Sequence, residues 1–128
     1  MKKKFLIVVA NYYKDISKGL LLSSKKLIPK SSKLKIIEGP GVFEIPMTIK
    51  KNIKRYDAFI ALGCVIKGQT PHFDFISQAS INAIMNLSID YKKPIGNGII
   101  TCLNLKQAKV REKKGAEATK AVLSILSQ

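Results

Sequence analysis

Residues 61–74 contain the side chain of this sequence that is best suited to proton transfer. His72, the only histidine, follows Thr70 and Pro71 in the segment ALGCVIKGQTPHFD. Threonine is a preferred N-cap and proline a preferred first helical residue, so a helix is predicted to begin here. Free backbone N–H groups at a helix start attract anions. An imidazole, which can titrate near neutral pH, is therefore expected beside a phosphate-binding turn.

His72 admits two interpretations. A helix dipole disfavours the charged form of an imidazole at the helix N-terminus, and a neutral ring can accept and return a proton. The same residue could equally be an exposed histidine at a helix start. The segment Gly68–Thr70 is either a phosphate cradle or an ordinary strand-to-helix turn. It lacks the pattern GxxxxGK[ST], which argues against binding of a nucleoside triphosphate.

Three further regions could contribute to a ligand site. Tyr12 could stack on a planar ring or be a half-exposed loop aromatic. The Gly-Pro-Gly turn at residues 39–41 brings the backbone close to whatever fills a cleft, and Glu44 beside it could bind hydroxyls or complement a helix dipole. Arg111, which has two lysines near it, could bind a phosphate dianion or belong to a solvated basic helix end.

The elements that position these residues follow from the apolar pattern. The first apolar run, residues 5–10, predicts a buried strand, because its six residues are fewer than a signal peptide needs. Strands that alternate with helices predict an α/β fold with a parallel sheet between helical layers, in one domain of 128 residues. We predict strands over residues 5–10, 34–37, 56–66 and 95–101, and helices over residues 15–28, 43–54, 73–91, 105–111 and 115–126.

The predicted helix over residues 73–91 is apolar around much of its circumference. We expect such a helix to be buried against more than one neighbour. Its main apolar stripe is predicted to consist of Phe73, Ile76, Ala79, Ala83 and Leu87.

The most distinctive segments of the sequence follow strands. Residues 11–13 follow the first strand, residues 39–44 the second and residues 63–72 the third. Ligands of parallel α/β sheets bind outside the carboxyl ends of the strands. One edge of the sheet is therefore expected to carry an aromatic ring, exposed amides, a carboxylate and an imidazole.

The net charge of +15 comes from 23 basic and 8 acidic residues. A strongly basic protein can bind nucleic acid, but these lysines are scattered along the chain and no RNP-like aromatic pattern accompanies them. We therefore favour a solvated basic surface over a nucleic-acid-binding site.

The cysteines, Cys64 and Cys102, form no CxxC pair, and there is one histidine. This usage argues against a structural zinc site and a disulfide framework, and favours free thiols in a reducing compartment. No apolar segment is long enough to span a bilayer, so we expect a cytoplasmic protein.

Four motifs cover much of the chain: GVFEIP at residues 41–46, GCVIKGQTPHFD at 63–74, GIIT at 98–101 and KGAEA at 114–118. In order and spacing they resemble the 6,7-dimethyl-8-ribityllumazine synthase family, also called the riboflavin synthase beta-chain family. The resemblance implies a flavodoxin-like three-layer α/β/α sandwich with a four-stranded parallel sheet. It also implies the penultimate step of riboflavin biosynthesis. There, 5-amino-6-(D-ribitylamino)uracil condenses with 3,4-dihydroxy-2-butanone 4-phosphate to give 6,7-dimethyl-8-ribityllumazine, phosphate and water.

The resemblance also implies roles for the candidate residues. His72 matches the proton-transfer residue, and Arg111 matches a phosphate-binding arginine that the neighbouring subunit supplies. Tyr12 matches the aromatic that stacks on the pyrimidine, and Lys114 matches a lysine of less defined role. The remaining matches are Val42, Phe43 and Glu44, which hold the ribityl chain largely through backbone amides, Cys64, Val65 and Ile66, which line the ring pocket, and Gln69 and Thr70, which bind phosphate.

Three departures from the family pattern change these expectations. Asn97 stands where many members have a phenylalanine, so polar contact would replace stacking on that side of the ring. The chain between Arg111 and Lys114 is shorter than usual by several residues, which alters the placement of Arg111 and a region that helps decide the size of the assembly. The N-terminus is also short and leaves little strand to pair with a neighbour.

The implied assembly is a homopentamer with active sites between adjacent subunits, and in some members twelve pentamers form a 60-subunit icosahedral shell. No cofactor, metal, membrane or specific nucleic-acid partner is expected, and riboflavin synthase is a candidate partner. Two alternatives remain open. A non-catalytic flavin or lumazine carrier would show no turnover, and a basic RNA-binding module would show salt-sensitive affinity for nucleic acid.

Overall fold

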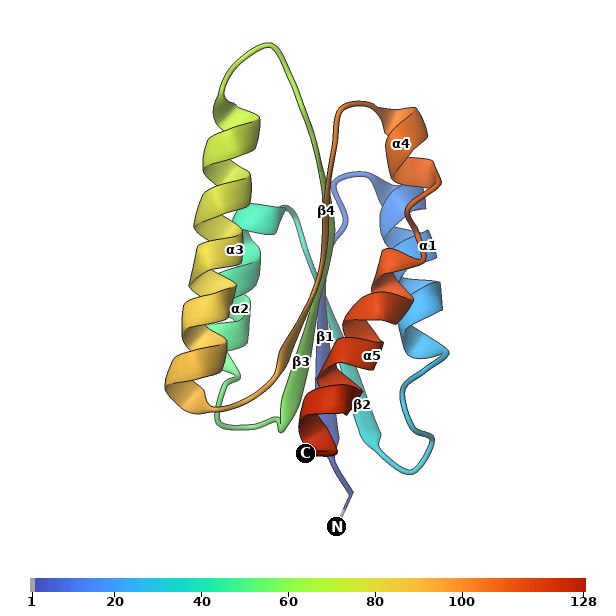
Figure 1. Cartoon of the computed structure of the whole chain (residues 1–128), viewed down its shortest axis with the longest axis vertical. Helices are drawn as coiled ribbons and strands as arrows, with labels where there is room; N and C mark the ends of the chain where they lie inside the picture. The colour runs from blue at the N-terminus through green and yellow to red at the C-terminus, as the bar shows by residue number, and fades with distance from the viewer. Residues whose placement is uncertain (1) are drawn as a thin grey trace.

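A computed structural model describes residues 2–128 and contains a sheet of four parallel strands in the order β2-β1-β3-β4 (Figure 1). Residues 5–10 and 58–64, in the two central strands, are all buried. This burial confirms that the first apolar run is a core strand, and the pairing confirms the parallel α/β class. The strands are β1 (Lys4–Ala10), β2 (Lys33–Gly39), β3 (Ala58–Ile66) and β4 (Ile95–Cys102).

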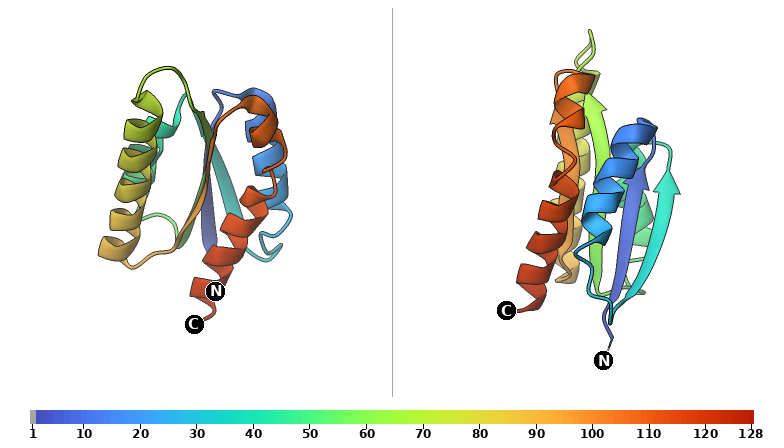
Figure 2. Two further views of the ribbon diagram at one scale, coloured as in Figure 1. Left: turned by 45° about the horizontal axis from the view of Figure 1, so that its top comes forward. Right: turned by 90° about the vertical axis from the view of Figure 1, so that its right-hand side faces the viewer.

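The helices lie in two layers on opposite faces of the sheet (Figure 2). One layer contains α2 and α3, and the other contains α1, α4 and α5 (Figure 1). This arrangement confirms the three-layer flavodoxin-like sandwich. The helices are α1 (Lys14–Lys25), α2 (Ile45–Lys51), α3 (His72–Tyr91), α4 (Leu105–Lys109) and α5 (Lys114–Leu126), and a 3-10 turn, η1 (Val42–Glu44), precedes α2.

The side chains of β1 alternate between the two layers. Phe5, Ile7 and Val9 belong to the core cluster beneath α1 and α5, whereas Leu6 and Val8 belong to the cluster beneath α2 and α3. Because both faces of the sheet are covered, the central strands require continuous apolar runs rather than alternation.

Three helices end earlier than the apolar pattern predicts. The first ends at Lys25 instead of residue 28, because the amides of Leu27 and Ile28 bond carbonyls three residues back at 3.2 Å, in tight turns. The predicted helix over residues 43–54 is η1 followed by α2, which ends at Lys51. The helix predicted over residues 105–111 ends at Lys109.

The strand boundaries also shift. β2 covers Lys33–Gly39 instead of residues 34–37, because all seven of its residues pair with β1. β3 begins at Ala58 and not at residue 56. Pro46 lies in the first turn of α2, the position where a helix tolerates proline.

The predicted stripe of α3 is partly wrong. Ser77, Ser80 and Ile84 are the buried residues of this helix, whereas Ala79 is exposed. Small serines allow the helix to pack closely on the core, and the hydroxyl of Ser80 donates a hydrogen bond to the Val42 carbonyl at 3.4 Å. Within one chain the opposite face of α3 remains open. Among residues 2–128, no helix is both long and apolar enough to cross a membrane.

Candidate active site

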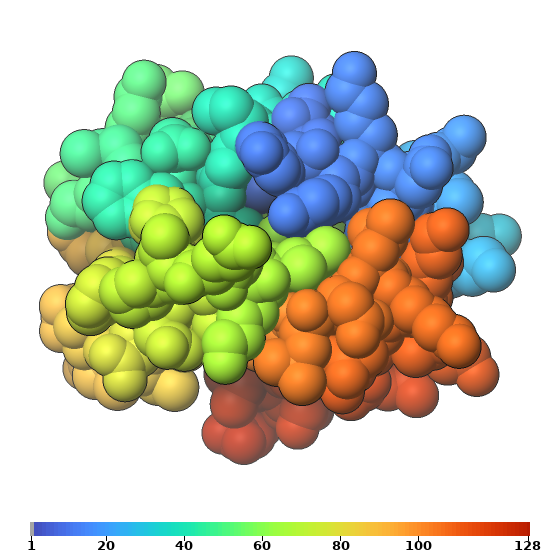
Figure 3. Space-filling model, turned by 90° about the horizontal axis from the view of Figure 1, so that it is seen from above, coloured from blue at the N-terminus to red at the C-terminus, as the bar shows by residue number. Residues whose placement is uncertain are grey.

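The segments that follow β1, β2 and β3 meet at the carboxyl edge of the sheet, as the topology predicts (Figure 3). The amide of Asn11 donates to the Gly39 carbonyl at 2.9 Å, which ties the first segment to the second. The Ser17 hydroxyl donates to the Ala10 carbonyl at 2.6 Å and satisfies the end of β1. These bonds hold the edge in place without using the side chains that face solvent.

Tyr12 is the most prominent aromatic side chain of this edge, with 74% of its surface exposed. Its ring meets that of Tyr13 edge to face, with 4.9 Å between the ring centroids and 81° between the planes. Burial raises the pKa of Tyr13, and the neighbouring Tyr12 adds to the effect. One face of the Tyr12 ring can therefore meet a planar ligand while Tyr13 supports its orientation.

The turn η1 exposes two of its three side chains. Val42 is only 6% exposed because it packs against β3, where a Cβ built at Gly63 would lie 2.7 Å from a Val42 methyl group. The absence of a side chain at Gly63 therefore lets η1 approach the strand. Phe43 and Glu44 are exposed. Val42 can thus offer a ligand its backbone, whereas Phe43 and Glu44 can also offer side chains.

The last residues of β3 do not share one face. Cys64 and Ile66 lie on the side of α1 and α5, and Val65 packs with the cluster beneath α2 and α3. Burial raises the pKa of the Cys64 thiol to about 12, and Cys102 adds to the effect. Cys64 is therefore a neutral thiol at physiological pH, which suits a pocket wall and not a nucleophile.

The loop between β3 and α3, with Gln69 and Thr70, is exposed, and so is His72 at the first residue of α3. The predicted helix start is wrong by one residue, because Pro71 and not Thr70 is the N-cap of α3. The His72 amide still donates to the Thr70 hydroxyl, in a long bond of 3.4 Å. The loop thus presents backbone amides, a hydroxyl and an imidazole together.

A second group of predicted residues lies along β4, the edge strand of the sheet. Asn97, Arg111 and Lys114 all line a pocket of about 620 Å³, together with Ile81, Val110 and other side chains of α3, β4 and α5. The Arg111 guanidinium donates to the Thr101 carbonyl at 3.5 Å. The Asn97 carboxamide oxygen accepts a bond from the Ile99 amide at 3.1 Å. With Lys113, three positive charges therefore border this pocket against one carboxylate, that of Glu117, and this surplus suits an anion.

The two groups are separate within one chain. The pocket lined by Asn97, Arg111 and Lys114 includes neither Tyr12, nor the η1 turn, nor the loop of residues 67–72. Arg111 nevertheless lies near the end of β3, because the Thr101 carbonyl to which it donates belongs to a residue that pairs with Val65.

Comparison with known proteins identifies the family of this chain. The family model of 6,7-dimethyl-8-ribityllumazine synthase matches residues 2–128. The chain belongs to the 6,7-dimethyl-8-ribityllumazine synthase family. Proteins of that name from Vesicomyosocius okutanii subsp. Calyptogena okutanii and Methylorubrum populi are 36% and 38% identical to it, over 98% and 97% of this chain and 84% and 81% of their own lengths. The enzyme from Bartonella bacilliformis is 43% identical over 86% of this chain and 76% of its own length.

Membership of the lumazine synthase family confirms the resemblance inferred from the four motifs. Sequence reasoning overlooked the exposed side chain of Val110 and the Thr101 carbonyl, which both lie beside Arg111. An apolar residue within a basic stretch was the available indication for Val110. No feature of the sequence indicates the contact with the Thr101 carbonyl, because every residue type has a backbone carbonyl.

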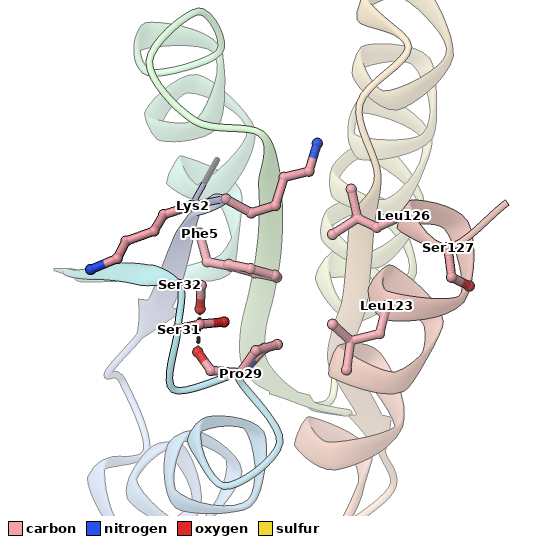
Figure 4. Close-up of a pocket in the computed structure, with 9 residues that line it drawn as sticks. Lys2, Phe5, Pro29, Ser31, Ser32, Leu123, Leu126 and Ser127 are labelled. Atoms are coloured by element: carbon pink, nitrogen blue, oxygen red, sulfur yellow. Dashed lines mark hydrogen bonds between the residues drawn. The ribbon is translucent and has the colours of Figure 1, made fainter.

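A pocket of about 630 Å³ lies at the opposite, amino end of the sheet (Figure 4). Its floor is apolar, with Phe5, Leu123 and Leu126, and Lys2 lies at its rim. No predicted site residue lines it, and it is remote from the carboxyl ends of the strands, where parallel sheets bind ligands. It is therefore not the candidate active site. Within residues 2–128, no group of three or more His, Cys, Asp or Glu side chains could hold a metal ion.

Proposed function

We propose that the chain catalyses the 6,7-dimethyl-8-ribityllumazine synthase reaction, a transferase step and the penultimate one of riboflavin biosynthesis. The observation that carries this proposal is the match of the family model to residues 2–128. The substrates are 5-amino-6-(D-ribitylamino)uracil and 3,4-dihydroxy-2-butanone 4-phosphate. The products are 6,7-dimethyl-8-ribityllumazine, phosphate and water.

The half-site at the strand ends is proposed to bind the pyrimidine. The exposed ring of Tyr12 stacks on the heterocycle. Backbone groups of Val42 and Phe43, together with Glu44, hold the ribityl hydroxyls. The end of β3, with Cys64, Val65 and Ile66, forms the wall of the ring pocket.

Proton transfer is assigned to His72. The pyrimidine amine attacks the ketone carbon, a C–N bond forms, and the carbonyl oxygen leaves as water after it gains protons. The imidazole can accept a proton from the nitrogen and return one to the oxygen. Because His72 is exposed at the start of α3, a bound substrate can reach it.

Phosphate binding is assigned to Arg111 with the amides and hydroxyl of Gln69 and Thr70. Elimination breaks a C–O bond and places negative charge on the departing phosphate, which these groups stabilise. Lys114 and Lys113 line the same pocket as Arg111 and add two further cations. Asn97 also lines that pocket. Its carboxamide is proposed to make a polar contact with the pyrimidine ring, in place of the stacking that an aromatic side chain would provide. Ring closure then mainly requires the two substrates to be held together.

We propose an active site shared between subunits, as the family resemblance implies, because the pocket that Arg111 lines includes no residue of the His72 loop. If Arg111 of one subunit completes the His72 half-site of the next, the protein must be an oligomer, and we propose a homopentamer. The exposed apolar side chains of α2 and α3 provide surface for such contacts. They include Met47, Phe75, Met85 and Ile89. A 60-subunit shell of twelve pentamers is the larger form that this unit could build.

We further propose that residues 1–128 form one catalytic domain, and that the protein acts in the cytoplasm. Its product is the substrate of riboflavin synthase, which makes that enzyme a candidate partner.

The decisive experiment supplies both substrates to the purified protein and follows lumazine formation by its ultraviolet absorbance. We expect a rate that saturates with each substrate and the release of one phosphate per lumazine. Binding of lumazine or flavin without any turnover would instead identify a carrier. Light scattering of the same sample distinguishes a pentamer from a shell.

A further inference from the structure

The turn that carries Arg111 is fastened to α1 by one side chain. The Ser23 hydroxyl lies 2.7 Å from the Glu112 carbonyl, to which it donates, and it accepts a bond from the Ala116 amide at 3.1 Å. Ser23 therefore bonds to the junction between α4 and α5 at Glu112 and to the first turn of α5 at Ala116. Helices α1 and α5 run side by side on the same face of the sheet (Figures 1 and 2).

Glycines allow the close approach that this contact requires. A Cβ built at Gly115 would collide with the Leu20 carbonyl oxygen of α1. A Cβ built at Gly19 would collide with the Glu112 carboxyl group. Gly115 thus lets the start of α5 lie directly on the backbone of α1, and Gly19 leaves room for the Glu112 side chain beside it.

The turn itself is short and internally bonded. The amide of Arg111 donates to the Ala108 carbonyl at 3.1 Å, and the amide of Lys114 donates to the Arg111 carbonyl at 3.0 Å. Glu112 lies inside the turn that the second of these bonds closes. Holding the Glu112 carbonyl therefore also restrains the backbone of Arg111, its neighbour in sequence and the first residue of that turn.

We propose that Ser23 is a positioning residue that holds Arg111 toward its pocket. The proposal rests on the proposed function, in which Arg111 binds the phosphate of the ketone substrate. Ser23 does not line the pocket that contains Arg111, so it acts only through the turn. Its two hydrogen bonds keep the guanidinium beside Asn97 and Lys114 before substrate arrives, which lowers the ordering cost of phosphate binding.

The neighbouring Ser24 provides a matched control. Its hydroxyl lies 2.7 Å from the Thr119 hydroxyl, so it too links α1 to α5, but to a residue within α5 and not to the turn. Ser23→Ala and Ser24→Ala each remove one oxygen from the same helix pair. An effect that comes only from weaker helix packing should appear in both variants.

We expect Ser23→Ala to raise the KM for 3,4-dihydroxy-2-butanone 4-phosphate about tenfold, with little change in the KM for the pyrimidine or in kcat. The Kd for inorganic phosphate, measured by calorimetry, should rise by a similar factor. Ser24→Ala should leave both constants at wild-type values, although its melting temperature falls. In an Arg111→Ala background, Ser23→Ala should have no further effect on either constant.

Three results would each overturn the positioning role. Ser23→Ala could leave the KM for the ketone and the phosphate Kd unchanged, or Ser24→Ala could change them equally. Ser23→Ala could also cause its full additional loss in the Arg111→Ala background. Failure of the proposed function looks different, because the wild-type protein would then form no lumazine. The phosphate Kd still tests the action of Ser23 on Arg111 in that case, since it requires no turnover.

Discussion

His72 lies at the first residue of α3, where its side chain is exposed beyond the end of β3. His72→Ala is expected to lower kcat about 10²-fold, the scale of general acid–base catalysis, without abolishing turnover, because both substrates remain positioned. Steady-state rates at saturating concentrations of both substrates measure this effect. Gln78→Ala, an exposed change on the same helix, is the control, and an unchanged kcat in His72→Ala would remove His72 from the mechanism.

Arg111 contributes a guanidinium that donates to the Thr101 carbonyl at the edge of the β4 pocket. Arg111→Ala is expected to raise the KM for the phosphorylated ketone about 10- to 100-fold, because a hydrogen bond to a charged group is lost. The KM for the pyrimidine should change far less. Lys109→Ala removes a nearby exposed cation that does not line the pocket and should leave both values unchanged. Equal increases for both substrates would contradict the assignment.

Cys64 makes stability depend on pH in the alkaline range. Burial raises the pKa of its thiol from 9.0 to about 12 in the folded protein. Between these values the unfolded chain has lost the proton that the folded chain keeps, so the free energy of unfolding falls as the pH rises, by up to about 1.4 kcal/mol per pH unit from this group. Urea denaturation from pH 8 to 11 should show a shallower fall for Cys64→Ala than for the wild type. Val9→Ala, which changes a buried side chain in the same cluster that cannot titrate, should retain the wild-type slope.

The candidate residues were predictable from the sequence to different degrees. Gln69, Thr70 and His72 belong to one continuous motif, and the strand that precedes them fixes their edge of the sheet. The meeting of Asn97, Arg111 and Lys114 in one pocket was not predictable from the pattern of residues. It depends on the turn between α4 and α5, whose geometry is set by backbone bonds and by a serine that looks like any other helix serine.

At the scale of the elements, α4 shows how a short helix is held in place before that turn. The Asn104 carboxamide oxygen accepts a bond from the Gln107 amide at 2.9 Å, and the Gln107 side chain accepts one from the Leu103 amide at 2.8 Å. A helix of five residues cannot persist without such support. Asn104→Ala is expected to lower the free energy of unfolding by about 1 kcal/mol in urea denaturation. Asn104→Asp should preserve the free energy of unfolding. If Asn104→Ala loses no more stability than the exposed control Lys106→Ala, the cap contributes nothing.

The strands were easier to predict than the faces of the helices. In β1 and β3 every central residue is apolar. The pattern therefore indicated both that these segments form strands and that the strands are buried. In α3 the apolar residues spread around the axis, and the face that packs on the core is marked by Ser77 and Ser80. Amphipathic reasoning assigns serine to solvent, so it cannot find a face where small size decides the packing.

At the scale of the whole molecule, the two edges of the sheet differ. β2 exposes Lys33 and Lys35 at its edge, and charged side chains there discourage pairing with another sheet. The opposite edge, β4, borders the cationic pocket. The net charge of +15 also opposes contact between like surfaces, so copies should associate through the apolar helix face and not through the lysine-rich one.

A site shared between subunits makes a prediction that a site within one chain cannot make. His72→Ala damages one half-site and Arg111→Ala damages the other. If the two variants are unfolded, mixed in equal amounts and refolded together, about one quarter of the shared sites should combine two intact halves, because each half is intact in half of the subunits. At a ketone concentration far below the KM of Arg111→Ala, activity should therefore recover to about one quarter of the wild-type value, well above that of either variant refolded alone. If each site lay within one chain, no mixture of these variants could contain an intact site, and the mixed sample would be no more active than the average of the two.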